Sequence, residues 1–367
     1  MSEPDEIDPF APRHQTAFVG QDAAEQEFLS AFNAGRMPHA WLIAGPRGVG
    51  KATLAFRIAR FVLAQGDAAA KDEGPSLFRD PLPKTVPTNL KIGPEHPVFR
   101  RVASGGHSDL RVFERTVNAK TGRMHRDIAV EEIREVRSFL SLTPAEGAWR
   151  VVIVDSADDM NPSSANALLK ILEEPPNRAL LLLVSHEPGR LLPTIRSRCR
   201  RLWLGPLDEA AMSALLATRA SDLSADDLAL LTQLSEGSIG RALKLAEEGG
   251  IELFREVRDL MGSLPRIDLI ELHRLGEKVA RDTSGDTMRA LGEMIDWLLV
   301  RFARVSAHVD NGPVVAGLPA QMAGSLDRWI AVWEKTRRLF GEAEGLNLDR
   351  KQVVLETFLA IEEAARS

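Results

Sequence analysis

The glycine-rich segment Gly45–Lys51 (GPRGVGK) limits the possible folds of this chain more than any other feature, because it stands between two apolar stretches. Residues 40–44 form a short apolar run typical of a buried strand, and residues 53–63 have the patterning of a helix. Glycines at such a turn let backbone N–H groups point at a phosphate, and the dipole of the following helix and the Lys51 ammonium add positive field. The segment therefore predicts a phosphate-binding loop, with a glycine-rich turn that holds no ligand as the alternative.

One position after this loop departs from the pattern of nucleotide-hydrolysing proteins. Ala52 stands where a Ser or Thr hydroxyl would hold Mg²⁺. Thr53 follows one residue later, and because one helical step turns a side chain by about 100°, its hydroxyl is a poor substitute. We expect ATP or ADP to bind, and the missing hydroxyl argues against Mg²⁺. The candidate nucleotide-binding residues of this segment are Gly45, Gly48, Gly50, Lys51 and Thr53.

A second apolar run, residues 149–154, is followed by Asp155, whose carboxylate would face a metal ion at the phosphates. Hydrolysis also needs a group that orients the attacking water, commonly a carboxylate immediately after that Asp. This chain has Ser156 there and Asp158 only later. Because the metal hydroxyl and the water-positioning acid are both missing, we expect slow ATP turnover or none. The alternative interpretation of Asp155 is that it caps a turn.

The order of strands and helices predicts the fold class. Further apolar runs at residues 179–185 and 201–204 follow the two already described, and helical patterns separate them. Such alternation is typical of an α/β domain with a parallel sheet. After residue 206 only helical patterns follow, in a small group up to residue 250 and a larger group beyond it.

These patterns predict three domains. An α/β phosphate-binding domain is expected over residues 1–205, a small helical lid over 206–250 and an all-α domain over 251–367. Within the first domain, residues 65–126 are rich in Gly, Pro, Asp and Lys and have little periodicity, so we predict an irregular insertion there.

Composition excludes several other classes of protein. The formal net charge of −6 argues against capture of nucleic acid or anionic lipid by the whole surface, so any DNA contact must be local. Cys199 is the single cysteine, which rules out an intrachain disulfide framework and a multi-cysteine zinc site and suits a reducing compartment such as the cytoplasm. Residues 1–12 lack the order of a signal peptide, and no run of about 18 apolar residues occurs, so we expect no membrane insertion.

Two further segments resemble a known family. Residues 155–176 read DSADDMNPSSANALLKILEEPP, and residues 191–199 read LLPTIRSRC. Together with GPRGVGK, they resemble the AAA+ subunits of the bacterial DNA polymerase III clamp loader. The resemblance covers residues 15–250 by motif and the helical remainder by order and length. It implies a RecA-like AAA+ domain, a helical lid and an all-α collar that oligomerises.

Several departures point to the delta-prime branch of that family rather than to its motor branch, called gamma or tau. Ala52 and Ser156 are two of them, and Gly240 stands where the motor subunits carry a phosphate-sensing arginine. The chain is also too short for the extensions of tau. Family members usually carry a four-cysteine zinc module where this chain has residues 65–126, which contain no cysteine, so we expect no zinc.

The resemblance also assigns two side chains. Arg198 lies in the Ser-Arg-Cys motif, whose arginine reaches the nucleotide of a neighbouring motor subunit, so Arg198 is the candidate catalytic residue as an arginine finger in trans. The alternative is a surface arginine within a basic run. Ser185 takes the place of a polar sensor of the γ-phosphate, with a plain strand-end hydroxyl as the alternative.

The implied function is that of a stator. The chain would assemble with motor and delta subunits into a ring that opens the sliding clamp and closes it on primed DNA during chromosomal replication. It would not be an active ATPase alone, and any nucleotidyltransferase activity belongs to the DNA polymerase holoenzyme of which it is a part. The competing hypothesis is an active AAA+ ATPase, either the motor subunit or a branch-migration protein. A third, a P-loop small-molecule kinase, would leave the LEEPP and SRC segments and the helical third unexplained.

Overall fold

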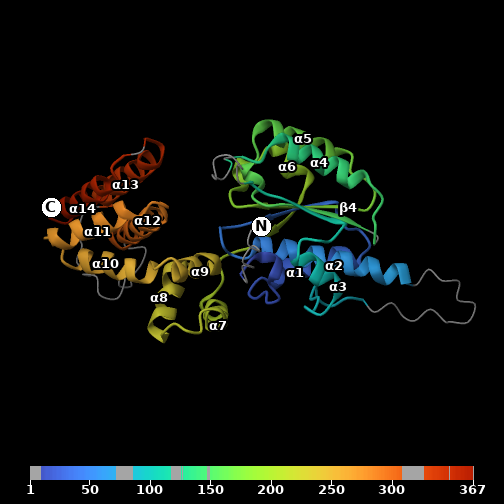
Figure 1. Ribbon diagram of the computed structural model, residues 1–367, viewed down its shortest axis with the longest axis horizontal. Helices are drawn as coiled ribbons and strands as arrows, with labels where there is room; N and C mark the ends of the chain where they lie inside the picture. Colours follow the sequence, from blue (N-terminus) through green and yellow to red (C-terminus); the bar gives the residue numbers. More distant parts are fainter. Residues whose placement is uncertain are drawn as a thin grey trace, which may run out of the picture. The chain divides into compact units, whose positions relative to one another are not determined.

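The computed structural model describes residues 10–71, 86–116, 125, 127–146, 149–307, 326–346 and 348–366. Contacts within the chain divide it into two compact units, which Figure 1 shows in ribbon form. The first unit comprises Met1–Ser221 with Thr232–Arg241, and the second comprises Asp222–Leu231 with Ala242–Ser367. The three-domain boundaries at residues 205 and 250 stay a prediction.

A parallel sheet of five strands forms the centre of the first unit. The strands lie in the order β2-β3-β4-β1-β5, and every neighbouring pair is parallel. Their bounds are β1 Ala40–Ala44, β2 Leu110–Phe113, β3 Arg150–Val154, β4 Ala179–Ser185 and β5 Arg200–Trp203. Strands β1, β3 and β4 are buried along their whole length, which is why they read as continuous apolar runs. This confirms the expected α/β fold with a parallel sheet.

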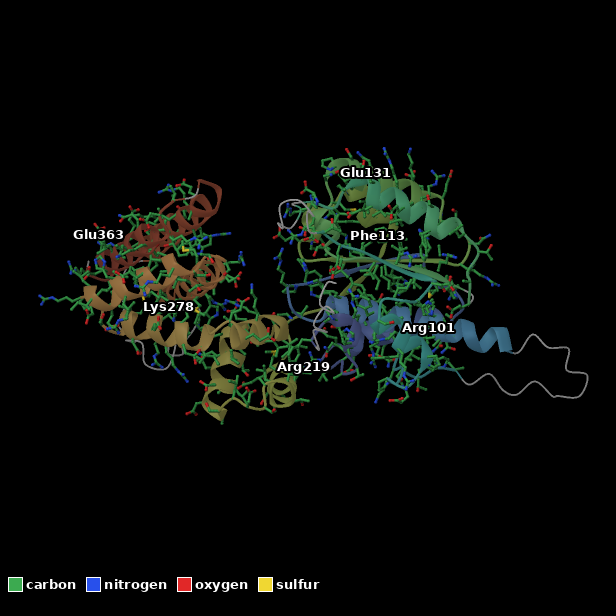
Figure 2. All side chains as sticks on the ribbon, viewed as in Figure 1. Arg101, Phe113, Glu131, Arg219, Lys278 and Glu363 are labelled. Carbon is green, nitrogen blue, oxygen red and sulfur yellow. The ribbon has the colours of Figure 1, made fainter. Side chains whose placement is uncertain are left out.

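Helices cover both faces of this sheet, as Figure 1 shows. One face packs against α1 (Asp22–Asn33), α2 (Lys51–Lys71) and α3 (Pro97–Ala103), and the other against α4 (Val130–Ser141), α5 (Pro162–Glu173) and α6 (Pro193–Arg198). Figure 2 labels Phe113 at the sheet and Glu131 on α4; Phe113 is buried and Glu131 is exposed. The two apolar clusters on either side fix the strand ends, and with them the candidate site.

The stretch from 65 to 126 differs from its prediction as an irregular insertion. Helix α2 continues to Lys71, α3 occupies 97–103, and β2 adds an edge strand over 110–113. The sequence signal of β2 is weak because only Leu110 and Phe113 of its four residues are buried, so no apolar run forms. Residues 72–85, 117–124 and 126 lie outside the described residues.

The described part of the second unit is helical. It contains the five helices α10 Gly250–Gly262, α11 Leu269–Arg281, α12 Asp286–Ser306, α13 Leu326–Leu346 and α14 Arg350–Arg366. Helix α12 packs on α13, and α14 packs on both α11 and α13. Before them come α7 (Glu209–Arg219), α8 (Ala225–Ser235) and α9 (Ile239–Glu247), of which α8 and α9 each run from one unit into the other.

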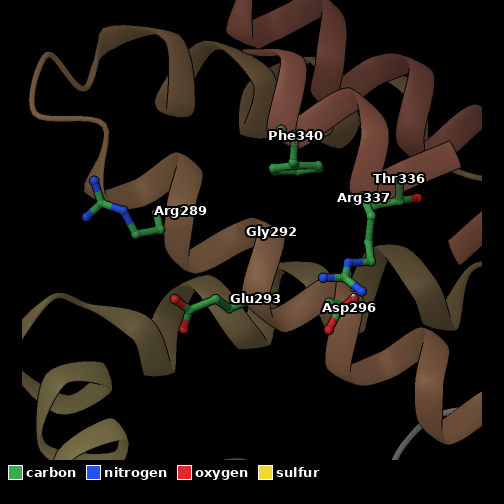
Figure 3. A pocket seen from close by; sticks show the side chains of 8 residues that line it. Arg289, Gly292, Glu293, Asp296, Thr336, Arg337 and Phe340 are labelled. Atoms are coloured by element: carbon green, nitrogen blue, oxygen red, sulfur yellow. Dashed lines mark ion pairs between the residues drawn. The ribbon is translucent and has the colours of Figure 1, made fainter. Parts of the chain in front are cut away.

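A pocket between α12 and α13 shows how closely these two helices approach. A Cβ atom at Gly292 would lie 2.7 Å from Cδ1 of Phe340, so the ring packs directly on the helix backbone. Figure 3 shows this ring near Gly292 and shows Arg337 beside Asp296. The Asp296 carboxylate also accepts a hydrogen bond of 2.6 Å from Nε1 of Trp333.

Within the described residues, no helix has the length and apolar content to cross a membrane.

Candidate nucleotide-binding site

The loop between β1 and α2 requires glycine at its special positions. Gly45, Gly48 and Gly50 have φ angles of 150°, 75° and 99°, which other residues rarely adopt. A Cβ atom at Gly45 would also lie only 2.0 Å from the carbonyl oxygen of Leu204. The loop leads directly into the N-terminus of α2, where unpaired backbone N–H groups favour an anion. This is the geometry expected of a phosphate-binding loop.

Lys51 is held within the loop. Its side chain is buried, and the ammonium donates hydrogen bonds to the carbonyl oxygens of Gly45, at 2.7 Å, and Pro46. Burial lowers the pKa of Lys51 to about 8, against the opposing effect of Asp155 and Asp158. The ammonium is therefore mostly charged at neutral pH, and a phosphate would compete with the two carbonyl groups for its protons.

The acidic side of the site begins where β3 ends. Asp155 donates its backbone N–H to the carbonyl oxygen of Phe113 at 2.8 Å, and burial raises the pKa of its carboxyl group to about 6. The carboxyl group of Asp158 instead accepts the backbone N–H of His186 at 2.9 Å and thereby fixes the turn after β4. One carboxylate oxygen of Asp158 is thus engaged in fixing this turn.

His186 lies at the site although the sequence patterns did not indicate it. Nε2 of its ring lies 3.0 Å from the hydroxyl oxygen of Ser156, a residue in the left-handed conformation with φ of 59°. Burial lowers the pKa of His186 to about 4, with a further contribution from Lys51, so the imidazole is neutral at pH 7. The sequence offers one indication of His186: it directly follows the apolar run of the buried strand that ends at Ser185.

The structure brings most of the predicted residues together. Strands β3, β4 and β1 are neighbours, so Asp155, Ser185 and the loop lie at one edge of the sheet, and Ser185 pairs in register with Ala44. Thr53 lies in the first turn of α2 and is half-buried. Among the described residues, no group of three or more His, Cys, Asp or Glu side chains could hold a metal ion.

A second segment, residues 237–241, packs on the loop, and it includes Gly240, the position at which the resemblance implied a lost phosphate-sensing arginine. Gly240 donates its N–H to the carbonyl oxygen of Gly48 at 3.0 Å, and the Ser238 hydroxyl donates to the carbonyl oxygen of Arg47 at 2.9 Å. A Cβ atom at Gly240 would lie 2.9 Å from Cα of Gly48. The close approach leaves no room for a side chain at position 240, so an arginine there is incompatible with this packing.

The wall beside the loop comes from the N-terminal segment. The ring of Phe18 lies 3.5 Å from the position of a Cβ atom at Gly50. Arg57 holds this segment by donating to the carbonyl oxygen of Thr16 at 3.3 Å, and Arg60 donates to the carbonyl oxygen of Gln15 at 2.8 Å. The buried arginines of α2 thus position an aromatic side chain next to the loop.

Arg198 stands apart from these residues. It ends α6, is exposed, and donates through Nη1 to the carbonyl oxygen of Thr194 at 3.1 Å. Its Nη2 lies 2.9 Å from Oε1 of Glu173, the last residue of α5. The residue predicted to act on another subunit is therefore a surface side chain with two partners in its own chain.

Comparisons with known proteins agree with the motifs. The family described as "DNA polymerase III, delta subunit" matches residues 91–208. The chain is 37% identical over 212 residues to DNA polymerase III subunit delta' of Pseudomonas aeruginosa, covering 58% of this chain and 56% of that protein. It is 32% identical over 220 residues to subunit delta' of Escherichia coli, covering 60% and 58%. The chain thus spans little more than half the length of these curated relatives.

A likeness to a solved structure accompanies these matches. A DNA polymerase III gamma subunit-related protein from Thermotoga maritima aligns with a TM-score of 0.44 and 18% identity, covering 92% of this chain and 100% of that one. The motifs, the parallel sheet and the two delta' relatives confirm the expected resemblance. Residues 91–208 match the DNA polymerase III delta subunit family, and the chain is similar to the two delta' subunits over somewhat more than half of its length.

Proposed function

We propose that this chain is the stator subunit of a clamp loader. It assembles with motor (gamma/tau) and delta subunits, helps to place the sliding clamp on primed DNA, and supplies Arg198 to the ATP of a neighbouring motor subunit. The observation that carries this proposal is the contrast between two sites. The chain's own phosphate-binding loop is packed against Gly240 and lacks the groups for turnover, whereas Arg198 is exposed.

The residues of the loop fit a nucleotide but not a tightly held Mg²⁺. Gly45, Gly48 and Gly50 would aim backbone N–H groups at the phosphates of ATP or ADP, and the Lys51 ammonium would turn to them from its two carbonyl partners. Ala52 offers no hydroxyl for the metal. Because burial raises the pKa of Asp155 to about 6, protons compete with a metal ion for its carboxylate below about that pH.

Turnover in this site would lack a base for the attacking water. Asp158 is engaged with the backbone of His186, and the neutral imidazole of His186 faces the hydroxyl of Ser156. One oxygen of the Asp158 carboxylate is already bonded in this turn, and a neutral imidazole that faces a hydroxyl is a poorer base for water than the carboxylate that Ser156 replaces. We propose that the chain alone is not an ATPase and that nucleotidyl transfer belongs to the holoenzyme.

Arg198 suits the role of a trans finger on chemical grounds. A guanidinium stays charged at every physiological pH and presents several N–H donors in a planar fork that matches phosphate oxygens. Placed against the γ-phosphate, such a cation stabilises the charge of the transition state and raises phosphoryl-transfer rates by roughly 10³–10⁵-fold. Exposure at the end of a short helix makes it accessible to a neighbouring subunit.

The remaining parts of the proposal concern assembly and location. Helices α10–α14 are proposed to form the collar through which the chain joins the ring, and the whole complex is proposed to work in the cytoplasm. This part of the proposal is supported by the family match over residues 91–208 and by the similarity to the delta' subunit of Pseudomonas aeruginosa.

A cationic groove supports a direct contact with DNA as a second, compatible function. The groove lies between α4 and α5, has a volume of about 500 Å³ and is lined by the exposed side chains of Arg134, Arg137 and Lys170. Hydroxyl and amide groups of Ser138, Ser163 and Asn166 complete its polar lining. Such a mixture of cations and neutral donors suits the phosphate backbone of a nucleic acid.

The groove is tested by replacing its three cations with alanine in the assembled complex. Affinity for primed DNA should fall, and the dependence of log K on log[salt] should become shallower by about one unit for each phosphate that the groove no longer neutralises. An unchanged salt dependence would show that this groove does not bind DNA.

The stator proposal itself is tested by assembling complexes that differ only in this subunit. Arg198→Ala should lower clamp loading by at least about tenfold, since one motor site loses its finger. Lys51→Ala and Arg201→Ala should leave loading within about twofold; Arg201 is an exposed arginine of the same basic run and serves as the matched control. Equal losses for Arg198→Ala and Arg201→Ala, or loss of loading with Lys51→Ala in a complex that still assembles, would contradict the proposal.

A further inference from the structure

We infer that Glu173 is a positioning residue for the Arg198 finger. The inference rests on the proposed function and adds to it a residue that holds the guanidinium in place before the neighbouring subunit arrives. It starts from one contact, the 2.9 Å ion pair between Nη2 of Arg198 and Oε1 of Glu173.

The backbones that carry these two side chains are fixed by the core. Glu173 is the last residue of α5 and follows the buried Leu172. Arg198 is the last residue of α6 and lies between the buried Ile195 and Cys199, which belong to the same apolar cluster as Leu172. Because packing sets the separation of the two helix ends, the ion pair depends only on the side-chain conformations.

Two bonds hold the guanidinium at two of its nitrogen atoms. Nη1 donates to the carbonyl oxygen of Thr194 at 3.1 Å, and Nη2 contacts Glu173. A guanidinium has more N–H donors than these two bonds use, so the remaining ones stay available to a phosphate. The contact therefore orients the finger and does not block it.

The benefit of such orientation is entropic. A free arginine side chain loses most of its rotamer freedom when it docks on a phosphate, and an arginine already held loses less. Glu173 and Arg198 are both half-exposed, so the pair belongs to the weak class of surface ion pairs. Loss of the carboxylate should therefore lower the turnover number of the served motor site by about two- to fivefold.

The experiment uses complexes reconstituted with Glu173→Gln, Glu173→Ala and the matched control Glu174→Gln. Glu174 is the next residue along the chain and is also exposed, so its substitution makes the same change of charge beside the pair. Steady-state ATP hydrolysis in the presence of clamp and primed DNA gives kcat and KM. We expect kcat to fall for both Glu173 variants, more for alanine than for glutamine, with KM within about twofold.

Two readouts separate positioning from a general structural effect. Raising the ionic strength from about 0.05 M to about 0.5 M should shrink the difference between the unsubstituted complex and Glu173→Gln, because salt screens the ion pair. In an Arg198→Ala background, adding Glu173→Ala should change kcat no further, since there is no finger left to position.

The outcomes distinguish this inference from the proposed function. If Arg198→Ala lowers kcat and Glu173→Ala does not, or if Glu173→Ala lowers kcat equally with and without Arg198, the inference is wrong and the proposed function stands. A rise in kcat for Glu173→Ala would also overturn it, because the ion pair would then restrain the finger. If Arg198→Ala itself has no effect, the proposed function is wrong.

Discussion

A buried ion pair between α1 and α2 provides a stability prediction that follows from geometry. The Glu25 carboxylate accepts hydrogen bonds from Nε and Nη2 of Arg57 at 3.2 and 3.1 Å and from the backbone N–H of Leu90 at 2.9 Å. The side chains of Arg57 and Glu25 are only 10% and 8% exposed. Glu25→Gln would leave the guanidinium buried without its counter-charge.

The cost of this substitution can be estimated from the burial of the pair. Removing one partner of a buried ion pair costs about 3–5 kcal/mol, and the retained amide oxygen puts the glutamine variant near 3 kcal/mol. In a unit of this size, each kcal/mol lowers the unfolding temperature by about 2–4 °C, which gives a decrease of about 6–12 °C. The N-terminal wall of the candidate site should loosen as well, because Arg57 also holds Thr16.

Scanning calorimetry of the full chain measures this effect, with Glu27→Gln as the control. Glu27 lies on the same helix, but its 3.0 Å ion pair with Arg200 is about half-exposed, so its loss should cost less than about 1 kcal/mol. Equal shifts for the two variants, or a shift below about 2 °C for Glu25→Gln, would show that burial does not decide the free-energy cost of losing the ion pair.

Three further predictions concern the loop and its neighbours. Because the pKa of Lys51 is about 8, nucleotide affinity measured by calorimetric titration should fall about tenfold between pH 7 and pH 9, as the ammonium loses its proton. Lys51→Arg should show no such decline. Gly45→Ala should lower the free energy of unfolding in urea by about 2–4 kcal/mol, because the new Cβ atom would clash with the carbonyl oxygen of Leu204. The control Gly189→Ala should lower it by less than about 1 kcal/mol, because a Cβ atom there would have no neighbour within 4 Å. Ala52→Thr should make ADP binding stronger in Mg²⁺ than in EDTA, and an affinity that ignores Mg²⁺ in this variant would show that the hydroxyl is not the missing metal ligand.

The fold and the centre of the site could be predicted because their signals are local. Fully buried strands such as β1, β3 and β4 produce continuous apolar runs, and the carboxyl ends of neighbouring parallel strands meet at one edge. The positions of Asp155 and Ser185 at this edge therefore follow from their places at the ends of such runs. Strand β2 was missed because a partly exposed edge strand of four residues produces no run.

The rest of the site depends on contacts between distant segments. Gly48 and Gly240 meet across 192 positions of the chain. The resemblance indicated a sensor position at Gly240, but neither local sequence indicates that its backbone bonds to Gly48. The same holds for Ser156 with His186 and for Glu173 with Arg198, which become neighbours only when the strands and helices pack. The sequence alone indicates the loss of a sensor arginine at position 240, and the structure adds a steric reason for its absence.

Steady-state ATP turnover by the purified chain, measured with Mg²⁺ and primed DNA alongside equilibrium nucleotide binding, decides whether the loop is a motor site. We expect nucleotide to bind and no turnover to be detected, because Ala52, Ser156 and Gly240 leave the loop without a metal hydroxyl, a water-positioning acid and a sensor arginine. Turnover at the rate of a motor subunit, abolished by Lys51→Ala, would contradict this expectation.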